Sequence, residues 1–524
     1  MKRRVVRVLR EMIQGLPGGG RTRDALSDHD VDLKIAILGT GFGGLGMAIR
    51  LVEAGIRSFT IYEKSNGVGG TWRDNRYPGA ECDVPSHLYS LSFAPKADWT
   101  MHYPHQPEIL AYLESCADKW NLRPNIQFNT EIVSASFDEH GAKWHLMTKA
   151  GDEIVADVVV CGLGQLNLPA IPDLEGMDDF GGKMFHSARW DSEIDLEGAR
   201  VAVIGNGASA VQFVPKIATS TRHLTVFQRS ANWILPKKNP AFSPRMKMLF
   251  QQFSLLDRAY RTLLYFTFEA RFFWFRRNSR FARVIERAAS KYRAEQLPDA
   301  ELRIKLKPDY PIGCKRILAV SDYYSTMMRA DVDVVTDHID RLSLTGVVTA
   351  DGQHHEADTI IFATGFDSTN FLAPVEFTGR SGTKLQDVWA EGAEAYLGMT
   401  VPKFPNLFLL YGPNTNLGHN SIVFMLECQI GYILECVHEL IERNLAYLDV
   451  KQSVADSYNR AVQKRMHQTV WESGCESWYK NEAGKVTNNW PTFTLEYWLA
   501  TRHPRFSVFD SRTRASTSRG DSHA

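Results

Sequence analysis

The hydrophobic pattern in the first half of the chain repeats one unit twice. Residues 34–39 form an apolar run that ends in glycine, residues 41–54 follow a helical pattern, and residues 58–63 form a second apolar run. A strand, a helix and a second strand in this order make a βαβ unit. The second copy is predicted over residues 200–205, 209–219 and 224–228. The chain is therefore expected to have an α/β fold with two Rossmann-like domains.

Two other regions differ from this pattern. Between the two units, residues 132–137, 143–148 and 157–161 lie between Gly and Asp turns and predict the strands of a small inserted β region. Residues 238–310 predict a helical insertion in the second domain. Its apolar residues recur at helical spacing among Arg and Lys, namely Leu249, Phe253, Leu256, Tyr260, Leu264 and Phe268.

The helical insertion has two interpretations. Its longest uncharged run, residues 262–268, is far shorter than the roughly 20 residues that span a bilayer. A basic, aromatic helix also suits peripheral contact with a membrane surface. Packing on the second domain is the favoured interpretation, because buried amphipathic helices are common in globular proteins.

The chain divides into two domains and two end segments. Residues 33–165 and 371–510 are expected to form the first domain, with a mobile loop in the latter part. Residues 166–370 are expected to hold a linker and the second domain. The basic residues 1–32 lack a long apolar stretch and are interpreted as a mobile or accessory segment. The polar residues 511–524 predict a disordered tail.

Each βαβ unit carries a glycine-rich turn typical of dinucleotide binding. In the first unit, Gly39 allows the tight turn, Gly41 lets the backbone approach a pyrophosphate, and Gly44 allows the helix to pack closely on the strand. The corresponding residues of the second unit are Gly205, Gly207 and Ala210. The amino end of each helix then offers amide donors to phosphates. Two such units predict two bound dinucleotides.

The charges that follow the two glycine turns differ in sign. Glu63 ends the second strand of the first unit and Arg229 follows the equivalent strand of the second unit. A carboxylate there accepts hydrogen bonds from ribose hydroxyls, as an FAD or NAD site requires. A guanidinium suits a 2′-phosphate. The chain is therefore expected to bind one dinucleotide without a 2′-phosphate and one NADP.

A third apolar run, residues 358–366, ends in Ala-Thr-Gly. Its glycine permits a close approach of the chain to a bound cofactor. This run is interpreted as a strand that supports a flavin site.

Composition excludes several classes of protein. The 524 residues are 44% hydrophobic and 23% charged, as in ordinary globular proteins, and 60 basic side chains balance 60 acidic ones. This balance gives no electrostatic case for nucleic-acid binding. Seven scattered cysteines without a C-x-x-C motif indicate reduced thiols in the cytoplasm, and argue against a disulfide framework, a zinc ribbon or a dithiol redox centre. No metal site and no transmembrane segment are expected.

The segment between the two units resembles a family fingerprint. Residues 180–191 read FGGKMFHSARWD, which matches the pattern F-x-G-x-x-x-H-x-x-x-W-[P/D] of the Baeyer–Villiger monooxygenases, a group of class B flavoprotein monooxygenases. The matching residues are Phe180, Gly182, His186, Trp190 and Asp191. The stretches at residues 69–93, PIGCKR and 396–427 are also similar to this family. The resemblance covers about residues 33–505.

The resemblance implies roles for individual residues. The implied FAD contacts are Gly39, Gly41, Gly44, Glu63, Thr71, Trp72, Asp83, Tyr89 and Val133. The implied NADPH contacts are Asn206, Gly207, Ala208, Ser209, Ala210, Arg229, Ser230, Lys315 and Arg316. Arg316 resembles the catalytic arginine and Asp83 its carboxylate partner. His186 and Trp190 belong to the implied interdomain linker, and Trp478 to a mobile loop over the nicotinamide cofactor.

The activity implied by the resemblance uses NADPH and O₂. A C4a-peroxyflavin would insert one oxygen atom next to a ketone carbonyl and give an ester or lactone. The aromatic insertion suggests a hydrophobic ketone. Three alternatives are a flavin-containing monooxygenase that oxidises nitrogen or sulfur, a disulfide reductase and a non-catalytic flavin-binding protein. The absence of C-x-x-C and C-x₄-C near the first unit argues against the reductase. Neither the particular ketone nor the oligomeric state is predicted.

Overall fold

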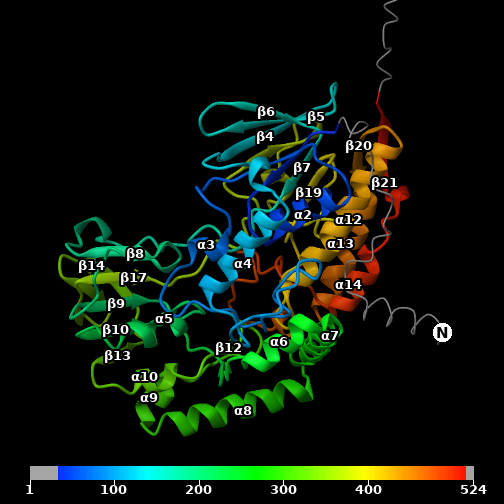
Figure 1. Ribbon diagram of the computed structural model, residues 1–524. Coiled ribbons are helices and arrows are strands. Elements are labelled where there is room, and N and C mark those ends of the chain that lie inside the picture. The colour runs from blue at the N-terminus through cyan, green and yellow to red at the C-terminus, as the bar shows by residue number, and fades with distance from the viewer. Residues whose placement is uncertain (1–32, 515–524) are drawn as a thin grey trace, which may run out of the picture.

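The structure is a computed structural model that describes residues 33–514. The predicted accessory segment, residues 1–32, and residues 515–524 of the predicted tail lie outside the described residues. Two bodies, each built on a parallel sheet, face one another, and the helical insertion runs along one side of both (Figure 1). The expectation of an α/β fold with two Rossmann-like domains is confirmed.

Five parallel strands form the sheet of the first domain, in the order β19-β7-β1-β2-β3. Their bounds are β1 Ile35–Leu38, β2 Phe59–Tyr62, β3 Ile126–Gln127, β7 Val158–Cys161 and β19 Leu407–Leu409. Strands covered on both faces need continuous apolar runs, and every residue of β1 and β7 is buried. The helices of this domain are α2 Phe42–Glu53, α3 Thr71–Asp74, α4 Gln106–Lys119, α11 Leu385–Val388, α12 Ile422–Glu442, α13 Gln452–Met466 and α14 Thr494–Thr501.

The second domain has its own sheet of five parallel strands, in the order β13-β10-β9-β17-β8. Their bounds are β8 Lys183–His186, β9 Arg200–Ile204, β10 His223–Phe227, β13 Val332–Val335 and β17 Thr359–Phe362. Helices α5 Ala210–Ile217 and α10 Tyr323–Met327 pack on each other beside it. The meander β14 Ile339–Ser343, β15 Gly346–Thr349 and β16 His354–Glu356 lies at one end, and β11 Ile234–Leu235 pairs with β12 Leu318–Ala319.

The predicted small β region is present, but its strands differ from those expected. β4 Ile132–Asp138, β5 Lys143–Thr148 and β6 Glu153–Ala156 form antiparallel pairs, and β18 Glu376–Thr378 joins β4. The run at residues 157–161 was wrongly predicted to belong here. It forms β7, which lies between β1 and β19 in the main sheet. Its unbroken apolar sequence suits a strand that is buried on both faces.

The apolar run at residues 358–366 lies in the second domain, within the range predicted for it. Its residues 359–362 form β17, which pairs with β9 and β8 in the second sheet, and its role in supporting a flavin site stays a prediction. Gly205 lies against its end, where an added Cβ would come within 2.5 Å of the Ala363 carbonyl oxygen.

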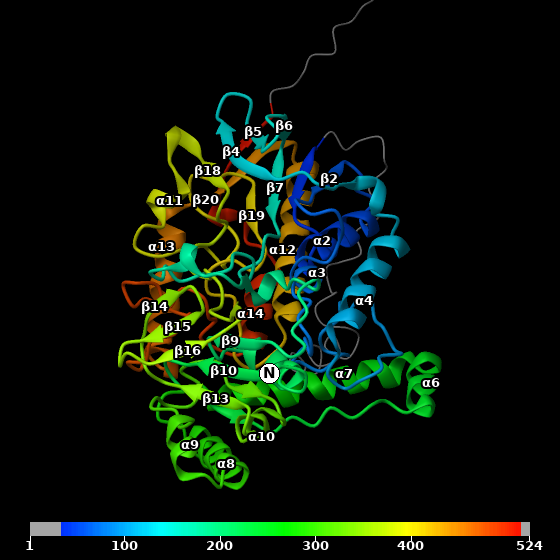
Figure 2. The same cartoon turned by 90° about the vertical axis from the view of Figure 1, so that its left-hand side faces the viewer.

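The helical insertion bridges both domains. It comprises α6 Pro244–Gln252, α7 Ser254–Glu269, α8 Arg280–Gln296 and α9 Ala300–Lys305, and Figure 2 shows α6 and α7 beside the first domain and α8 below the second. α8 packs on β11 and α10, as predicted for the second domain, and Leu264, Tyr265 and Phe268 of α7 also pack on α12 of the first domain. None of the helices between residues 33 and 514 has the length and apolarity to cross a membrane.

The end of the described chain is ordered. Residues 511–514 were predicted to belong to a disordered tail, but β21 Phe509–Thr513 pairs antiparallel with β20 Leu445–Val450. The Arg514 guanidinium also contacts the buried Asp157 carboxylate at 2.8 Å. Polar composition led to the wrong prediction, because an edge strand needs few apolar residues when backbone hydrogen bonds hold it.

We expect Gly44→Ala to destabilise the first domain. An alanine Cβ at this position of α2 would lie 1.9 Å from the Gly39 carbonyl oxygen, which is backbone and cannot move aside. Overpacking of this kind typically costs about 1–3 kcal/mol. Thermal unfolding monitored by circular dichroism measures the effect. The control is Gly431→Ala in α12, where an added Cβ meets nothing within 4 Å. This substitution also removes the entropic cost of a glycine inside a helix. An unchanged melting temperature in Gly44→Ala would contradict the close packing.

Candidate active site

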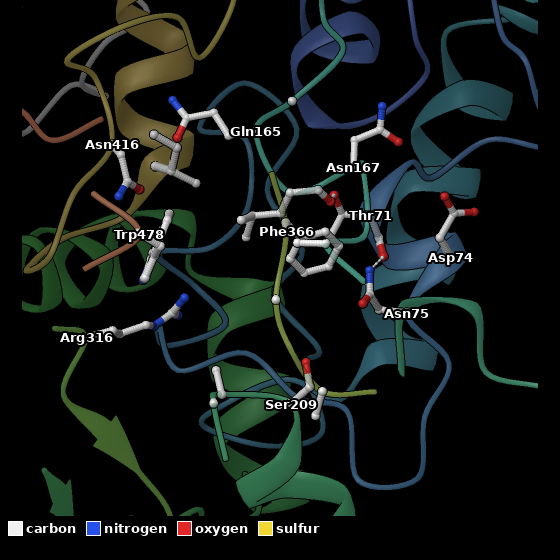
Figure 3. A pocket seen from close by; sticks show the side chains of 18 of the residues that line it. Thr71, Asp74, Asn75, Gln165, Asn167, Ser209, Arg316, Phe366, Asn416 and Trp478 are labelled. Atoms are coloured by element: carbon white, nitrogen blue, oxygen red, sulfur yellow. Dashed lines mark hydrogen bonds between the residues drawn. The ribbon is translucent and has the colours of Figure 1, made fainter. Parts of the chain in front are cut away.

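A cavity of about 1260 Å³ lies between the two domains. Both glycine turns line it, together with the segment after β7 and part of the insertion. Single small-molecule sites usually occupy about 300–1,000 Å³, so this cavity has room for more than one ligand. Figure 3 shows Arg316 and Trp478 on one side, Thr71 and Asn75 on the other, and Phe366 between them.

The first glycine turn is shaped to receive phosphates. Gly39 has a φ of +96°, and a Cβ there would lie 2.8 Å from the Gly162 carbonyl oxygen. Gly41 caps α2 without a side-chain hydrogen bond, so the first amides of the helix stay available to an anion. Gly44 does not line the cavity. It packs on Gly39 instead, in agreement with a role in close helix–strand contact.

Glu63 stands beside this turn at the end of β2. One carboxylate oxygen accepts hydrogen bonds from the Thr40 amide at 2.9 Å and the Thr40 hydroxyl at 2.6 Å. The other accepts one from the Ser65 amide at 2.9 Å. The side chain is therefore held in one orientation, and the oxygen that accepts from Ser65 keeps a lone pair for a ribose hydroxyl.

The second glycine turn has the same form. Gly205 has a φ of +104°, and the turn leads into α5 through Gly207 and Ser209, which line the cavity. The Asn206 amide donates hydrogen bonds to the Gln228 side chain at 2.8 Å and to the Ser230 carbonyl at 2.9 Å. These bonds connect the turn to the segment that follows β10, which includes Arg229.

Two basic residues meet beside the second turn. The Lys315 ammonium donates a hydrogen bond to the Ser230 hydroxyl at 2.8 Å, and Arg229 lies close by with an exposed side chain. Burial lowers the pKa of Lys315, and the charge of Arg229 lowers it further. Two cations that repel each other in one corner of the cavity form a suitable site for a dianionic phosphate.

Asp83 and Arg316 form an ion pair inside the cavity. Arg316 Nη2 lies 2.5 Å and Nε 3.1 Å from the same oxygen of Asp83. The charge of Asp83 raises the pKa of Arg316 further above its ordinary value. Burial alone would raise the pKa of Asp83, but the charge and hydrogen bonds of Arg316 outweigh burial and lower it. Both groups are therefore charged at neutral pH.

Residues of the second domain hold the loop that carries Asp83. The Gln212 amide of α5 donates a hydrogen bond to the Glu81 carbonyl at 3.0 Å and accepts one from the Tyr77 hydroxyl at 3.0 Å. The Lys237 ammonium lies 2.8 Å from the Glu81 carboxylate and 2.9 Å from the Cys82 carbonyl oxygen. The Asp83 loop thus belongs to the first domain by sequence but is positioned by the second.

Most of the predicted site residues line this cavity, with a few exceptions. The lining residues are Gly39, Gly41, Glu63, Thr71, Trp72, Asp83, Tyr89, Asn206, Gly207, Ala208, Ser209, Arg229, Ser230, Lys315, Arg316 and Trp478. Val133 does not line it, although its neighbour Ile132 does, because alternate residues of a strand point to opposite faces. Ala210, the first residue of α5, does not line the cavity either and is buried, and its small size allows close packing.

The fingerprint at residues 180–191 is part of the second sheet. It supplies the edge strand β8, and an added Cβ on Gly182 would lie 2.3 Å from the Asp358 carbonyl oxygen. Trp190 packs on Phe213 of α5 at 5.2 Å between ring centroids. None of the five fingerprint residues lines the cavity. The predicted linker role of this segment and its rearrangement stay predictions.

A disulfide joins Cys314 to Cys475, so the expectation of reduced thiols throughout was wrong. The two cysteines are 161 residues apart, and only the fold brings them together. Cys314 precedes Lys315, and Cys475 precedes the segment with Trp478, whose carbonyl accepts hydrogen bonds from Ser368 and Asn488. The bond therefore links the cationic corner to the segment of Trp478, which also lines the cavity.

Several residues of the site carry no sequence signal. Tyr479 is buried and Tyr411 is partly buried near Arg316, and burial raises the pKa of both above the ordinary range of tyrosine. Gln165, Asn416 and Arg271 also line the cavity. They lie in loops or a short helix without periodicity, so only their position in space identifies them.

Comparison with known proteins shows to which family this chain belongs. Residues 32–374 match the family described as Flavin-binding monooxygenase-like. A Baeyer-Villiger monooxygenase from Pseudomonas aeruginosa is 45% identical over 482 residues, which cover 92% of each chain. One from Streptomyces coelicolor is 41% identical over 472 residues, which cover 90% of this chain and 91% of that relative.

Solved structures agree with these relatives. An oxidised steroid monooxygenase bound to NADP has a TM-score of 0.83 at 30% identity, covering 92% of this chain and 100% of that one. The closed form of cyclohexanone monooxygenase has a TM-score of 0.83 at 27% identity, with coverage of 92% and 99%. The chain belongs to the flavin-binding monooxygenase-like family. Within that family, the two relatives described above are named Baeyer-Villiger monooxygenases, in agreement with the fingerprint.

The buried His186 predicts that the folded protein becomes less stable in acid. Burial lowers the pKa of His186 to about 4, and its Nδ1 accepts a hydrogen bond from the Ala188 amide as a neutral ring. An unfolded histidine takes up a proton near pH 6.5. The stabilisation is therefore complete above about pH 6.5 and is lost as pH falls towards 4. We expect His186→Asn, which keeps an acceptor, to flatten the fall of melting temperature between these pH values. His140→Asn, at an exposed site, is the control. Equal slopes in both variants would contradict the assignment.

Proposed function

We propose that this chain is an NADPH- and O₂-dependent flavoprotein monooxygenase that inserts one oxygen atom next to a ketone carbonyl and gives an ester or lactone. The observation that carries this proposal is the charged pair of Arg316 and Asp83 inside a cavity that two dinucleotide turns share. The relatives named Baeyer-Villiger monooxygenase favour this reaction over oxidation of nitrogen or sulfur.

FAD fits the first turn. The uncapped start of α2 would receive its pyrophosphate and Glu63 its ribose. The Trp72 indole donates a hydrogen bond to the Tyr89 hydroxyl at 3.1 Å, so these two aromatic side chains form a rigid wall of the cavity next to this turn. When bound, the reduced flavin supplies the activation of O₂.

NADPH fits the second turn. Gly207 and Ser209 precede α5, whose amino end would receive the pyrophosphate. Arg229, Ser230 and Lys315 would hold the 2′-phosphate, because they combine two positive charges with a hydroxyl donor. Neighbouring structures with FAD and NADP bound support both assignments.

Arg316 and Asp83 act on the charge that develops during oxygen transfer. Negative charge forms on the attacking oxygen and then on the oxygen of the ketone carbonyl. The guanidinium of Arg316 stabilises both without releasing a proton, because Asp83 raises its pKa. Asp83 holds it through two hydrogen bonds, so no reorganisation is needed during the reaction. The aromatic side chains of Phe268, Trp274 and Phe275 exclude water from this side of the cavity.

Location and membrane contact remain predictions. The cytoplasm was predicted from the cysteine pattern, and the bond between Cys314 and Cys475 weakens that argument. Leu255, Leu263 and Phe266 on the outer face of α7 are exposed, which is compatible with peripheral membrane contact.

We expect Arg316→Ala to keep its flavin and to lose ester formation by about 10²-fold or more. The variant lacks the positive charge that stabilises the reacting oxygens, whereas the FAD turn lies elsewhere. Flavin absorbance of the purified protein and mass spectrometry of ketone products measure the two effects. Arg280→Ala, at an exposed site of α8, is the control. Normal ester formation in Arg316→Ala would refute the role. A sulfide oxidised faster than any ketone by the wild type would favour the alternative function.

We expect Arg229→Gln and Lys315→Gln to weaken the binding of NADPH but not the binding of NADH. Each removes a charged contact to the 2′-phosphate, and such contacts contribute about 1.5–3 kcal/mol, or roughly 10- to 100-fold in KM. NADH lacks this phosphate and its KM should stay nearly constant. Anaerobic flavin reduction with each nucleotide measures the ratio. Arg222→Gln, just before β10 at the opposite end of that strand, is the control. An equal loss for NADH and NADPH would contradict the phosphate site.

A further inference from the structure

One arginine of the cavity has no partner in the machinery described so far. Arg271 follows α7 in the short 3₁₀ helix Ala270–Trp274, and it lines the same cavity as Arg316. Its guanidinium lies 3.5 Å from the ring centroid of Phe268 and 5.4 Å from that of Trp274. The insertion therefore places a cation among aromatic rings in the wall of the cavity.

The charges around Arg271 do not balance. Asp83 is paired with Arg316 at 2.5 Å, and Glu81 is paired with Lys237 at 2.8 Å. Among residues 33–514, no carboxylate lies within 4.0 Å of the Arg271 guanidinium. This wall of the cavity therefore carries one positive charge more than its carboxylates neutralise.

An unpaired charge in this position is unfavourable for folding. Burial lowers the pKa of Arg271, and the nearby oxygen of Tyr103 raises it only in part. Cation–π contact with the rings returns less free energy than the desolvation of an ion requires. A cation held at such a cost in a ligand cavity is a candidate for binding an anion.

We infer that Arg271 binds the carboxylate of a keto acid whose ketone carbonyl lies at Arg316. The inference rests on the proposed ketone oxidation and specifies its substrate class. A single unpaired guanidinium matches one negative charge, and its planar donors fit the two oxygens of a carboxylate. The phosphates of both dinucleotides have other donors, at the two turns and at Arg229 and Lys315, so Arg271 remains available to the substrate.

The test compares keto acids with their methyl esters. The probes are 2-oxocyclohexyl alkanoic acids with one, two or three chain methylenes, each with its methyl ester, so that only the charge differs within a pair. For at least one pair, the wild type should show a kcat/KM for the acid about 10-fold above that for the ester. Arg271→Gln should lower kcat/KM for that acid by about 10- to 100-fold and change the ester by less than about 3-fold, because one charge-assisted contact is lost.

Two further variants separate charge from structure. Arg271→Lys keeps the charge and should keep a preference for the acid. Arg277→Gln removes an exposed arginine of the same segment and should change neither substrate. Equal acid-to-ester ratios in the wild type and Arg271→Gln would overturn the inference. A wild type without preference for any acid would overturn it as well, even if the glutamine variant does not fold.

Failure of the proposed function gives a different result. If neither acids nor esters are oxidised, ketone oxidation is refuted, and calorimetry of the same acids with the FAD-loaded protein still decides the role of Arg271. Binding that is lost in Arg271→Gln but kept in Arg277→Gln supports a carboxylate site. Equal binding in all three proteins, or no binding in any, overturns it.

Discussion

The ion pair between Asp83 and Arg316 is the interaction on which the rest of the site depends. It joins a loop of the first domain to a loop of the second across 233 residues of sequence. Removing either partner would leave a charge uncompensated in the cavity, which is strongly unfavourable. Gln212 and Lys237 hold the same loop from the second domain, so the relative position of the two domains and the position of the reactive guanidinium are set together.

The two domains use one backbone design for two opposite electrostatic tasks. Each places a glycine turn at the carboxyl end of a buried strand and a charged residue at the end of the next strand. Glu63 offers acceptors to hydroxyl groups, whereas Arg229 and Lys315 offer positive charge to a phosphate. The cavity therefore distinguishes its two dinucleotides by charge, and the insertion adds a third environment, aromatic and cationic around Arg271.

Errors in the sequence analysis share a cause. The strand β7 was assigned to the small antiparallel sheet, although it lies in the main sheet of the first domain. The Cys314–Cys475 bond was excluded because its members form no local motif. In each case the local pattern is correct or uninformative, and the outcome depends on which distant segment lies opposite. Arg271 was missed for the same reason, since nothing in the sequence indicates that its neighbours are rings instead of carboxylates.

The sequence by itself determined the two βαβ units, the positions of their glycine turns, the sign of the charge beside each turn and the family. These features depend on residues within about 25 positions of one another and on backbone conformations that only glycine tolerates, such as that of Gly39. The tertiary structure alone decided that Asp83 meets Arg316, that α7 lies on the first domain and that Arg271 faces the cavity without a carboxylate. Contacts between distant segments depend on the packing of whole domains, and no local pattern of hydrophobic residues specifies them.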